Sequence, residues 1–341
     1  MPQAAIIGTG LIGASIGLAL REQGWATRGW DPASEAMDVA VERGAVEPAD
    51  SIRQAIEGVD LVVLAGPLSA NVETLGALDT DALITDVTSV KQPLITQAPA
   101  RLRFVGGHPM AGREHAGAGA ASGSLFRGAA WILCDDTARP EDLARMQEIV
   151  ASVGANPVIM SAEHHDRVVA AISHLPHLLA VALVELVAEN PDTVDLVSGS
   201  FRDLTRVASA ESAWWPEVLT ANSSSVGDAL DGLIGHLQTL RRDIDSGDLD
   251  SVAGSLDRAR LRRAEMAPPV AGIEVILADR PGEIGRVGHA LQTSRVDVRD
   301  LQLRHAVHGG GGILTISVRP GEVETLKAAL TREGFEVEEQ T

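Results

Sequence analysis

The sequence predicts an α/β protein built from a Rossmann-type doubly wound parallel sheet, an all-α segment and a ferredoxin-like βαββαβ unit. Short apolar runs alternate with helix-compatible segments over residues 1–160, which is typical of a parallel sheet covered by helices on both faces. Residues 161–266 show helical patterns without a convincing strand, and residues 271–341 return to strands. A chain of 341 residues is long enough for two or three domains of roughly 100 to 200 residues each.

The composition indicates an ordinary globular protein with an acidic surface. Hydrophobic residues make up 45%, charged residues 22%, and the formal net charge is −19. This charge argues against nucleic acid and membranes as partners, because phosphate groups bind basic surfaces. We see no secretory signal and no run of about 18 uncharged apolar residues. The single cysteine, Cys134, excludes an intramolecular disulfide, so we expect a cytoplasmic location.

A strand, a glycine-rich turn of sequence GTGLIG and a helix-compatible run open the chain. Gly8 allows the tight turn, Gly10 lets the backbone approach a pyrophosphate, and Gly13 lets the helix pack closely on the strand. Leu11 and Ile12 lie in the turn itself, and the helix-compatible run covers residues 14–23. The first N–H groups of that helix would point at the phosphates, so we expect Leu11 and Ile12 among the cofactor-binding residues. This pattern favours a dinucleotide site over a glycine-rich turn without a ligand.

An acidic residue follows the second predicted strand. Asp31 lies about 20 residues beyond the glycine turn, where a carboxylate accepts hydrogen bonds from the adenosine ribose hydroxyls. The same charge repels a 2′-phosphate, so we expect NAD rather than NADP. Arg28 is close in sequence and leaves NADP open.

Further residues follow later strands of the same sheet. Apolar runs that predict strands of this domain cover residues 60–65, 82–87, 103–107, 130–134 and 156–160. Gly66 and Pro67, Ser89 and His108 each follow such a run. Ligands of doubly wound sheets bind at the carboxyl ends of the strands, so we expect these residues at one edge, with Gly66 and Pro67 beside the cofactor.

The stretch GGHPMAG places His108 between backbone-permissive glycines and a proline. Glycine lets the backbone approach a ligand and proline restricts its freedom, which suits a catalytic histidine. The alternative is a tight turn in which His108 only bonds to its neighbours.

The helical segment contains an apolar run over residues 166–190 that we expect to be buried and kinked at Pro176. His174 and His177 face similar directions, three residues apart. They are either ligand-binding residues or a hydrogen-bonded pair in the core, and no third residue has suitable spacing for a metal. An all-apolar helix in a helical domain predicts an intersubunit core and a homodimer.

Arg202, Asp203 and Arg206 follow in the stretch SGSFRDLTRVA. A guanidinium fork pairs with a carboxylate in bidentate fashion, so these arginines could clamp an anionic substrate. The alternative is a set of ordinary ion pairs at a helix end.

The C-terminal region alternates strands and helices in the order βαββαβ. The predicted strands cover residues 272–277, 296–303, 313–318 and 335–337, and a turn at 279–285 leads into the first helix.

Five motifs in chain order resemble the prephenate and arogenate dehydrogenases of tyrosine biosynthesis. They are GTGLIG, DVTSVK, GGHPMAG, SHLPH and SGSFRDLTRVA, and the tail with DRPGEIG resembles an ACT regulatory domain. The resemblance implies an NAD-binding Rossmann domain over 1–160, a helical substrate and dimerisation domain over 161–266 and an ACT domain over 271–341. It implies oxidative decarboxylation, in which NAD takes hydride from the ring carbon bearing the hydroxyl, CO2 leaves the opposite carbon and an aromatic ring results.

The family motifs also imply roles for single residues. Neutral His108 would accept a hydrogen bond from the substrate hydroxyl, and Ser89 would orient His108. Arg206 would hold a substrate carboxylate with Asp203 fixing it, and His177 would contact the substrate.

Two further positions concern substrate choice. Glu114 resembles a position that shapes the mouth of the site. Arg113, a cation beside the substrate side chain, would favour the keto acid prephenate over the amino acid arogenate.

The ACT resemblance implies an allosteric effector, and tyrosine, as pathway product, is the expected inhibitor. The expected effector-binding residues are Asp279, Pro281, Gly282 and Ile284. Three alternatives remain: an arogenate dehydrogenase, a hydroxy-acid dehydrogenase and a non-catalytic NAD-binding amino-acid sensor.

Overall fold

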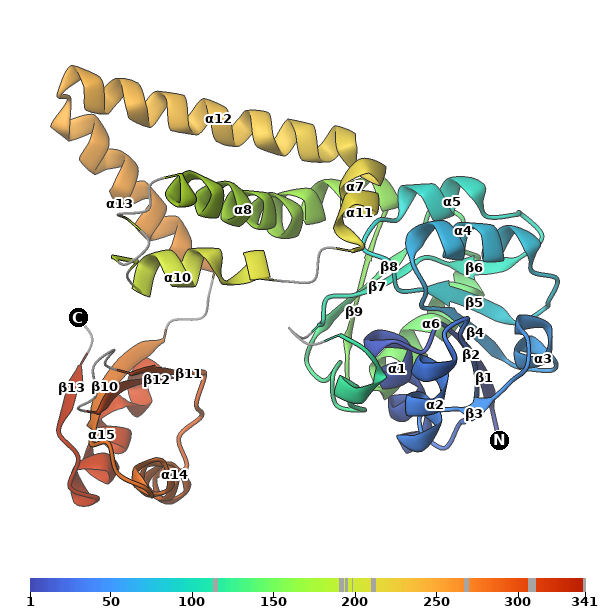
Figure 1. The fold of residues 1–341 in the computed structure, drawn as a ribbon, viewed down its shortest axis with the longest axis horizontal. Coiled ribbons are helices and arrows are strands. Elements are labelled where there is room, and N and C mark those ends of the chain that lie inside the picture. The colour runs from blue at the N-terminus through green and yellow to red at the C-terminus, as the bar shows by residue number, and fades with distance from the viewer. Residues whose placement is uncertain are drawn as a thin grey trace. The chain divides into compact units, whose positions relative to one another are not determined.

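The computed structural model describes residues 1–112, 116–189, 193, 196–197, 199–209, 213–266, 270–305 and 311–339. The chain divides into two compact units, residues 1–235 and 236–341, which Figure 1 colours from blue to red along the chain.

The first unit is built on a six-stranded parallel sheet. Its strands are β1 (Gln3–Ile7), β2 (Ala26–Trp30), β3 (Glu47–Pro48), β4 (Leu61–Leu64), β5 (Leu83–Asp86) and β6 (Arg103–Val105). The strand order is β3-β2-β1-β4-β5-β6, the doubly wound order of a dinucleotide-binding sheet. The order reverses between β1 and β4, so the crevice for a ligand opens at their carboxyl ends. The predicted Rossmann-type sheet is confirmed, with β3 as an additional short strand.

Helices cover both faces of this sheet (Figure 1). They are α1 (Leu11–Glu22), α2 (Ser34–Glu42), α3 (Ile52–Ile56), α4 (Leu68–Ala77), α5 (Gln92–Gln97) and α6 (Pro140–Ser152). Successive residues of a strand point to opposite faces, and the core divides accordingly. Ile6 and Val63 belong to one buried cluster, whereas Ile7 and Leu64 belong to the other.

A second, three-stranded sheet follows, made of β7 (Gly107–Pro109), β8 (Ala130–Cys134) and β9 (Asn156–Met160). The run predicted as one strand over 103–107 is therefore two strands, because the chain changes sheets at Gly106. Only glycine fits at position 107, since a Cβ there would lie 2.6 Å from the Asp86 carbonyl oxygen. This close approach holds the second sheet against the end of β5.

The apolar run at residues 166–190 lies within a longer helical stretch. It comprises α7 (Ala162–Val169), the π-helix η2 (Ala170–His174) and α8 (Leu175–Ala188). The π-helix η2 ends two residues before Pro176, where the kink was predicted, and such turns are frequent at functional sites. The expected burial is wrong for the single chain, because Ile172 is 60% and Leu186 65% exposed.

The expectation that no segment is long and apolar enough to cross a membrane also needs correction. Residues Ala162–Ala188 form one 27-residue helical run that passes this test by length and composition. This run is continuous only because the π-helix η2 joins α7 to α8. Each of these two helices alone is shorter than a membrane span. A helix that packs against another subunit has the same composition.

Among the described residues after α8, the first unit and the start of the second contain four further helical elements. They are α10 (Gly199–Thr205), the 3-10 helix η3 (Arg206–Ser209), α11 (Trp215–Ala221) and α12 (Ser223–Ser246). Val218 of α11 belongs to a buried cluster of the parallel sheet. Helix α11 is therefore anchored on the nucleotide-binding half.

The second unit contains α13 (Leu249–Met266) and a four-stranded antiparallel sheet. Its elements are β10 (Ala271–Leu277), α14 (Glu283–Ser294), β11 (Asp300–His305), β12 (Gly312–Val318), η4 (Pro320–Glu322), α15 (Val323–Arg332) and β13 (Val337–Glu339). The strand order is β11-β12-β10-β13, and the predicted element order βαββαβ is present. The strand predicted at 296–303 instead runs over Asp300–His305, because β11 pairs with β12 only from Asp300 onward.

Candidate active site

The glycine turn between β1 and α1 is closely packed at two of its glycines and open at the third. Gly8 has φ +97°, and a Cβ on it would lie 2.6 Å from the Ala65 carbonyl carbon. A Cβ on Gly13 would lie 1.9 Å from the Gly8 oxygen, whereas one on Gly10 would meet nothing within 4 Å. The space at Gly10, beside the N–H groups of Leu11 and Ile12 that begin α1, fits a pyrophosphate.

Asp31 follows β2 and lies beside this turn. Its Oδ2 accepts hydrogen bonds from the Thr9 backbone N–H at 2.7 Å and from the Thr9 hydroxyl at 3.3 Å, and its Oδ1 accepts one from the Ala33 N–H at 2.9 Å. These bonds fix the carboxylate at the carboxyl edge of the sheet. A carboxylate has about four acceptor sites, so it can also accept from ribose hydroxyls.

Arg28 is directed to other partners. Its Nη1 donates to the Gln54 carbonyl at 2.9 Å, and its Nη2 donates to Gln3 Oε1 at 3.0 Å and to the Glu57 carbonyl at 2.5 Å. A guanidinium held by three acceptors is not free to bind a 2′-phosphate. The arrangement therefore favours NAD.

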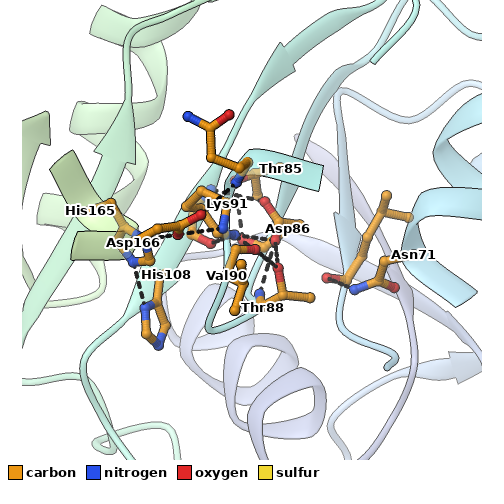
Figure 2. A network of polar contacts seen from close by, with 12 residues as sticks. Asn71, Thr85, Asp86, Thr88, Val90, Lys91, His108, His165 and Asp166 are labelled. Carbon is orange, nitrogen blue, oxygen red and sulfur yellow. Dashed lines mark hydrogen bonds and ion pairs between the residues drawn. The ribbon is translucent and has the colours of Figure 1, made fainter. Parts of the chain in front are cut away.

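The turn after β4 forms the opposite side of the crevice. Gly66 donates its N–H to Asn71 Oδ1 at 3.1 Å, and Asn71 Nδ2 donates to the carbonyls of Gly66 at 2.9 Å and Leu64 at 3.2 Å. Asn71 is buried, so these bonds fix the Gly66 and Pro67 turn rigidly. Figure 2 labels Asn71 near the polar network described next.

His108 is the first member of a hydrogen-bonded chain of three side chains (Figure 2). Its Nδ1 lies 2.8 Å from His165 Nε2, and His165 Nδ1 lies 2.7 Å from Asp166 Oδ1. A carboxylate only accepts, so His165 donates through Nδ1 and accepts through Nε2. His108 must then donate through Nδ1, which leaves the lone pair of its Nε2 available for a ligand.

Asp166 is held in place by the backbone. Its Oδ1 accepts from the Lys91 N–H at 2.8 Å and its Oδ2 from the Gln92 N–H at 2.9 Å. These two N–H groups begin α5, where a negative charge is favourable. The Asp166 carbonyl accepts from Asn222 Nδ2 at 2.7 Å. The chain from His108 thus ends on a fixed carboxylate.

A buried ion pair fixes the backbone just before His108. The side chains of Lys91 and Asp86 are fully buried and paired. Lys91 Nζ also donates to the Gly107 carbonyl at 2.6 Å and to the Thr88 hydroxyl at 3.0 Å, and the Gly107 N–H donates to Asp86 Oδ1 at 3.0 Å. Both polar groups of Gly107 are therefore bound by the two members of one ion pair.

The electrostatics of this region keep His108 neutral. Burial lowers the pKa of His108 well below 6.5, and His165, Lys91 and His174 lower it further. Burial also lowers the pKa of His165. A neutral His108 is an acceptor at Nε2, as the substrate hydroxyl would require.

His177 of α8 is buried against residues of α11 and η3. Its ring stacks on Trp215 with centroids 3.8 Å apart and an interplanar angle of 5°, and it bonds to the Val207 backbone. Val207 follows Arg206 at the start of η3. The structure therefore brings His177 close to the segment that carries Arg206, while Arg202, Asp203 and Arg206 are exposed.

His174 matches the core interpretation better than the ligand interpretation. It is buried, its ring meets Trp215 edge-on at 6.0 Å, and its Nδ1 lies 3.4 Å from Asn222 Nδ2. Burial lowers its pKa to about 4.

The structure does not confirm the predicted roles of three further residues, Ser89, Arg113 and Glu114. Ser89 is half-buried in the loop after β5, but the partner that orients His108 among the described residues is His165. Arg113 and Glu114 lie outside the described residues.

The expected effector residues lie in the turn after β10 and at the start of α14, where Gly282 has φ +96°. They are Asp279, Pro281, Gly282 and Ile284, all exposed.

Sequence reasoning missed His165, Asp166 and Lys91. Lys91 stands inside the motif DVTSVK, but no role followed from the motif alone. His165 and Asp166 stand in a helix that begins after Ser161, whose hydroxyl accepts from the His164 N–H. A histidine next to an aspartate at a helix start was the available signal.

Two family models match this chain. Residues 16–159 match "Prephenate dehydrogenase, nucleotide-binding domain", and residues 161–258 match "Prephenate dehydrogenase, dimerization domain". Prephenate dehydrogenase of Bacillus subtilis (strain 168) is 30% identical over 336 residues, which cover 92% of this chain and 91% of that protein.

Solved structures agree with these matches. The crystal structure of prephenate dehydrogenase from A. aeolicus in complex with hydroxyphenyl propionate and NAD+ is 29% identical, with a TM-score of 0.72, covering 78% of this chain and 99% of that one. Synechocystis arogenate dehydrogenase is 28% identical, with a TM-score of 0.69, covering 78% of this chain and 100% of that one. With matching models over most of its length and relatives of similar fold, the chain belongs to the prephenate dehydrogenase family.

Proposed function

We propose that the protein is an NAD-dependent prephenate dehydrogenase. It converts prephenate to 4-hydroxyphenylpyruvate, CO2 and NADH in tyrosine biosynthesis. The observation that carries this proposal is the chain from His108 through His165 to Asp166, which leaves a neutral Nε2 acceptor on His108. Membership of the family and the open cradle at Gly10 support the same conclusion.

The chemistry requires an acceptor for the substrate hydroxyl. The C–H bond at the ring carbon bearing the hydroxyl breaks with its electron pair, and positive charge develops on that carbon and its oxygen. NAD, held by the turn at Gly10 and by Asp31, supplies the hydride acceptor when bound. His108 Nε2 accepts a hydrogen bond from the hydroxyl and stabilises the developing charge.

Loss of CO2 completes the reaction. The bond from the ring to the carboxylate breaks, its electron pair enters the ring, and the hydroxyl remains as a phenol. Hydride and CO2 are the only groups lost, so no net proton is taken up. A neutral His108 is therefore sufficient, and its low pKa suits this role.

Substrate binding is assigned to residues of the helical segment and the loops. Arg206, fixed by Asp203, binds a substrate carboxylate, and His177 contacts the substrate from its stack on Trp215. Ser89 contacts the hydroxyl or the nicotinamide from the loop after β5.

Arg113 and Glu114 are the proposed determinants of substrate choice. Arg113 favours the keto acid side chain, and Glu114 shapes the mouth of the site. Arogenate dehydrogenation is the second candidate, because an arogenate dehydrogenase is among the similar structures.

The test is NADH formation by purified protein offered prephenate or arogenate, each with NAD or NADP. Turnover of prephenate with NAD is expected. Turnover of arogenate alone would contradict the assignment of Arg113, and faster turnover with NADP would contradict that of Asp31. Turnover with neither substrate would contradict the proposed function and favour a non-catalytic sensor.

The domain organisation and assembly are part of the proposal. The Rossmann domain covers 1–160, the helical domain 161–266 and the regulatory domain 271–341. A homodimer forms through the helical domain, supported by the matching dimerisation model and by exposed apolar residues of α8 such as Leu179, Val184 and Leu186. A concentration-independent dimer in sedimentation is the expected result.

The C-terminal βαββαβ unit is proposed as an ACT domain that binds tyrosine. Its strand order and the exposed turn from Asp279 to Ile284 support a small-molecule site there. Tyrosine at millimolar concentration should lower activity or raise the melting temperature. Absence of both effects would contradict the assignment.

A further inference from the structure

The short helix α11 contacts three parts of the site from one end to the other. At its start Trp215 stacks on His177. In its first turn Glu217 accepts a hydrogen bond from the Ser69 N–H of α4 at 2.6 Å. Directly after its end Asn222 donates to the carbonyl of Asp166 at 2.7 Å. Helix α11 thus links three features of the site. They are His177, the start of α4 beside the Gly66 and Pro67 turn, and Asp166, which ends the hydrogen-bonded series of side chains from His108.

The contact at Glu217 completes the start of α4. That helix begins after Pro67, which provides no side-chain cap, and its first turn contains no acidic residue. The first N–H groups of a helix need acceptors and favour a negative charge. Glu217, 148 residues further along the chain, supplies both. Ser69 stands two residues after Pro67, so the bond holds the turn that borders the cofactor.

Buried packing supports the same connection. Val218 of α11 lies in one hydrophobic cluster with Leu68 and Leu75 of α4. The apolar contact fixes how closely α11 approaches α4, and the hydrogen bond from Ser69 fixes the register along the helix. A packed neighbour without such a bond could slide, because apolar contacts are not directional.

We propose that Glu217 is a positioning residue that holds the Gly66 and Pro67 turn in register with His177 and Asp166. This inference rests on the proposed function, since it assumes a cofactor at that turn and a substrate at His177. Hydride transfer depends steeply on the distance and orientation of the two reactants, and a displacement of about 1 Å can lower a rate by about 10²-fold. Glu217 acts through the turn and does not touch the reacting atoms.

The test compares three substitutions at position 217 with a control on α4. Glu217→Ala removes the acceptor. Glu217→Asp keeps the charge but withdraws the carboxylate by one methylene, and Glu217→Gln keeps an acceptor oxygen at the same reach. Glu73→Gln changes an exposed carboxylate of the same helix. The measurements are the NAD dissociation constant by calorimetry without substrate, kcat and KM for prephenate at saturating NAD, and the melting temperature.

The alanine and aspartate variants should both raise the NAD dissociation constant about fivefold to tenfold, which corresponds to the usual net value of a single hydrogen bond. They should lower kcat by about tenfold or more while KM for prephenate changes less. The glutamine variant should keep most of the affinity and kcat, and the Glu73 variant should match the original protein. Because glutamine and aspartate differ from glutamate by small changes, folding is expected in both.

Two results would overturn the proposal. One is an NAD dissociation constant and kcat within twofold of the original protein in both the alanine and aspartate variants. The other is rescue by aspartate but not by glutamine, which would assign the effect to charge alone. Failure of the proposed function appears separately, as absence of prephenate turnover in the unsubstituted protein, and the NAD measurements remain valid in that case.

Discussion

His108 Nδ1 lies 2.8 Å from His165 Nε2, and this contact decides which nitrogen of His108 can accept a bond from a ligand. Asp166 fixes the tautomer of His165, and His165 in turn fixes that of His108. The acceptor nitrogen of His108 is therefore selected by His165 and, through it, by Asp166.

Replacing His165 should impair catalysis without affecting cofactor binding. In His165→Gln the ring that orients His108 is lost, so both tautomers and several orientations of His108 become accessible. We expect kcat to fall about 10-fold to 10²-fold, which is less than or equal to the lower limit of about 10²-fold for removal of an acid or base itself, because His108 is still present. Steady-state kinetics with prephenate would measure this.

The control for that substitution is the neighbouring exposed His164. His164→Gln should leave kcat unchanged, and NAD affinity should be unchanged in both variants. Equal kcat values for the two variants would refute the orienting role of His165.

The pH dependence of kcat/KM should report the low pKa of His108. Since burial and nearby positive charge hold that pKa well below 6.5, His108 stays an acceptor as pH falls. We expect kcat/KM for prephenate to remain flat from about pH 8 through pH 6.5, whereas an unperturbed histidine would be half protonated near that point. An acid limb centred at about pH 6.5 or above would contradict a neutral His108.

Breaking the buried ion pair should destabilise the fold strongly. Lys91→Met leaves the Asp86 carboxylate buried without its cation, and such a loss costs about 3–5 kcal/mol of unfolding free energy. Arg145→Met, which breaks an exposed pair with Glu148, should cost less than about 1 kcal/mol. Denaturant titration of both variants measures the difference. Similar losses of unfolding free energy in the two variants would show that breaking the buried pair costs no more than breaking an exposed one.

His174 should make stability depend on pH. Its pKa is about 4 in the folded protein and 6.5 in the reference state, so between these values the unfolded chain binds a proton that the folded chain does not. The contribution of neutral His174 to the free energy of unfolding is fully present above about pH 6.5 and is lost as the pH falls toward 4. This loss amounts to about 3 kcal/mol in total.

The measurement is the unfolding free energy at several pH values for the unsubstituted protein and for His174→Asn. The unsubstituted protein should lose more stability on acidification than the variant, by up to about 3 kcal/mol. Parallel curves would contradict the shifted pKa of His174.

The parallel sheet and its glycine turn could be predicted from sequence because their signals are local. GTGLIG specifies a tight turn through residues that directly follow one another, and Gly8 and Gly13 have the close contacts that this pattern implies. Asp31 was found in the same way, by its distance along the chain. Alternating apolar runs likewise indicated the strands without knowledge of their partners.

The orientation of His108 could not be predicted, because its partner is 57 residues away. Sequence reasoning assigned that role to Ser89, which is nearer in sequence and equally polar. Only the packing of α7 against the second sheet brings His165 to His108. The prediction that the apolar run of α8 is buried was wrong for another reason. The sequence of an apolar helix is the same whether its own chain or a second subunit covers it.

The most direct test of the catalytic role of His108 is kcat for prephenate in His108→Asn, with the NAD dissociation constant measured in parallel. We expect kcat to fall about 10²-fold to 10⁴-fold while NAD affinity stays within twofold, because in the proposed mechanism His108 accepts a bond from the substrate and not from the cofactor. A variant with near-normal kcat would show that His108 is not the acceptor and would contradict the proposed mechanism.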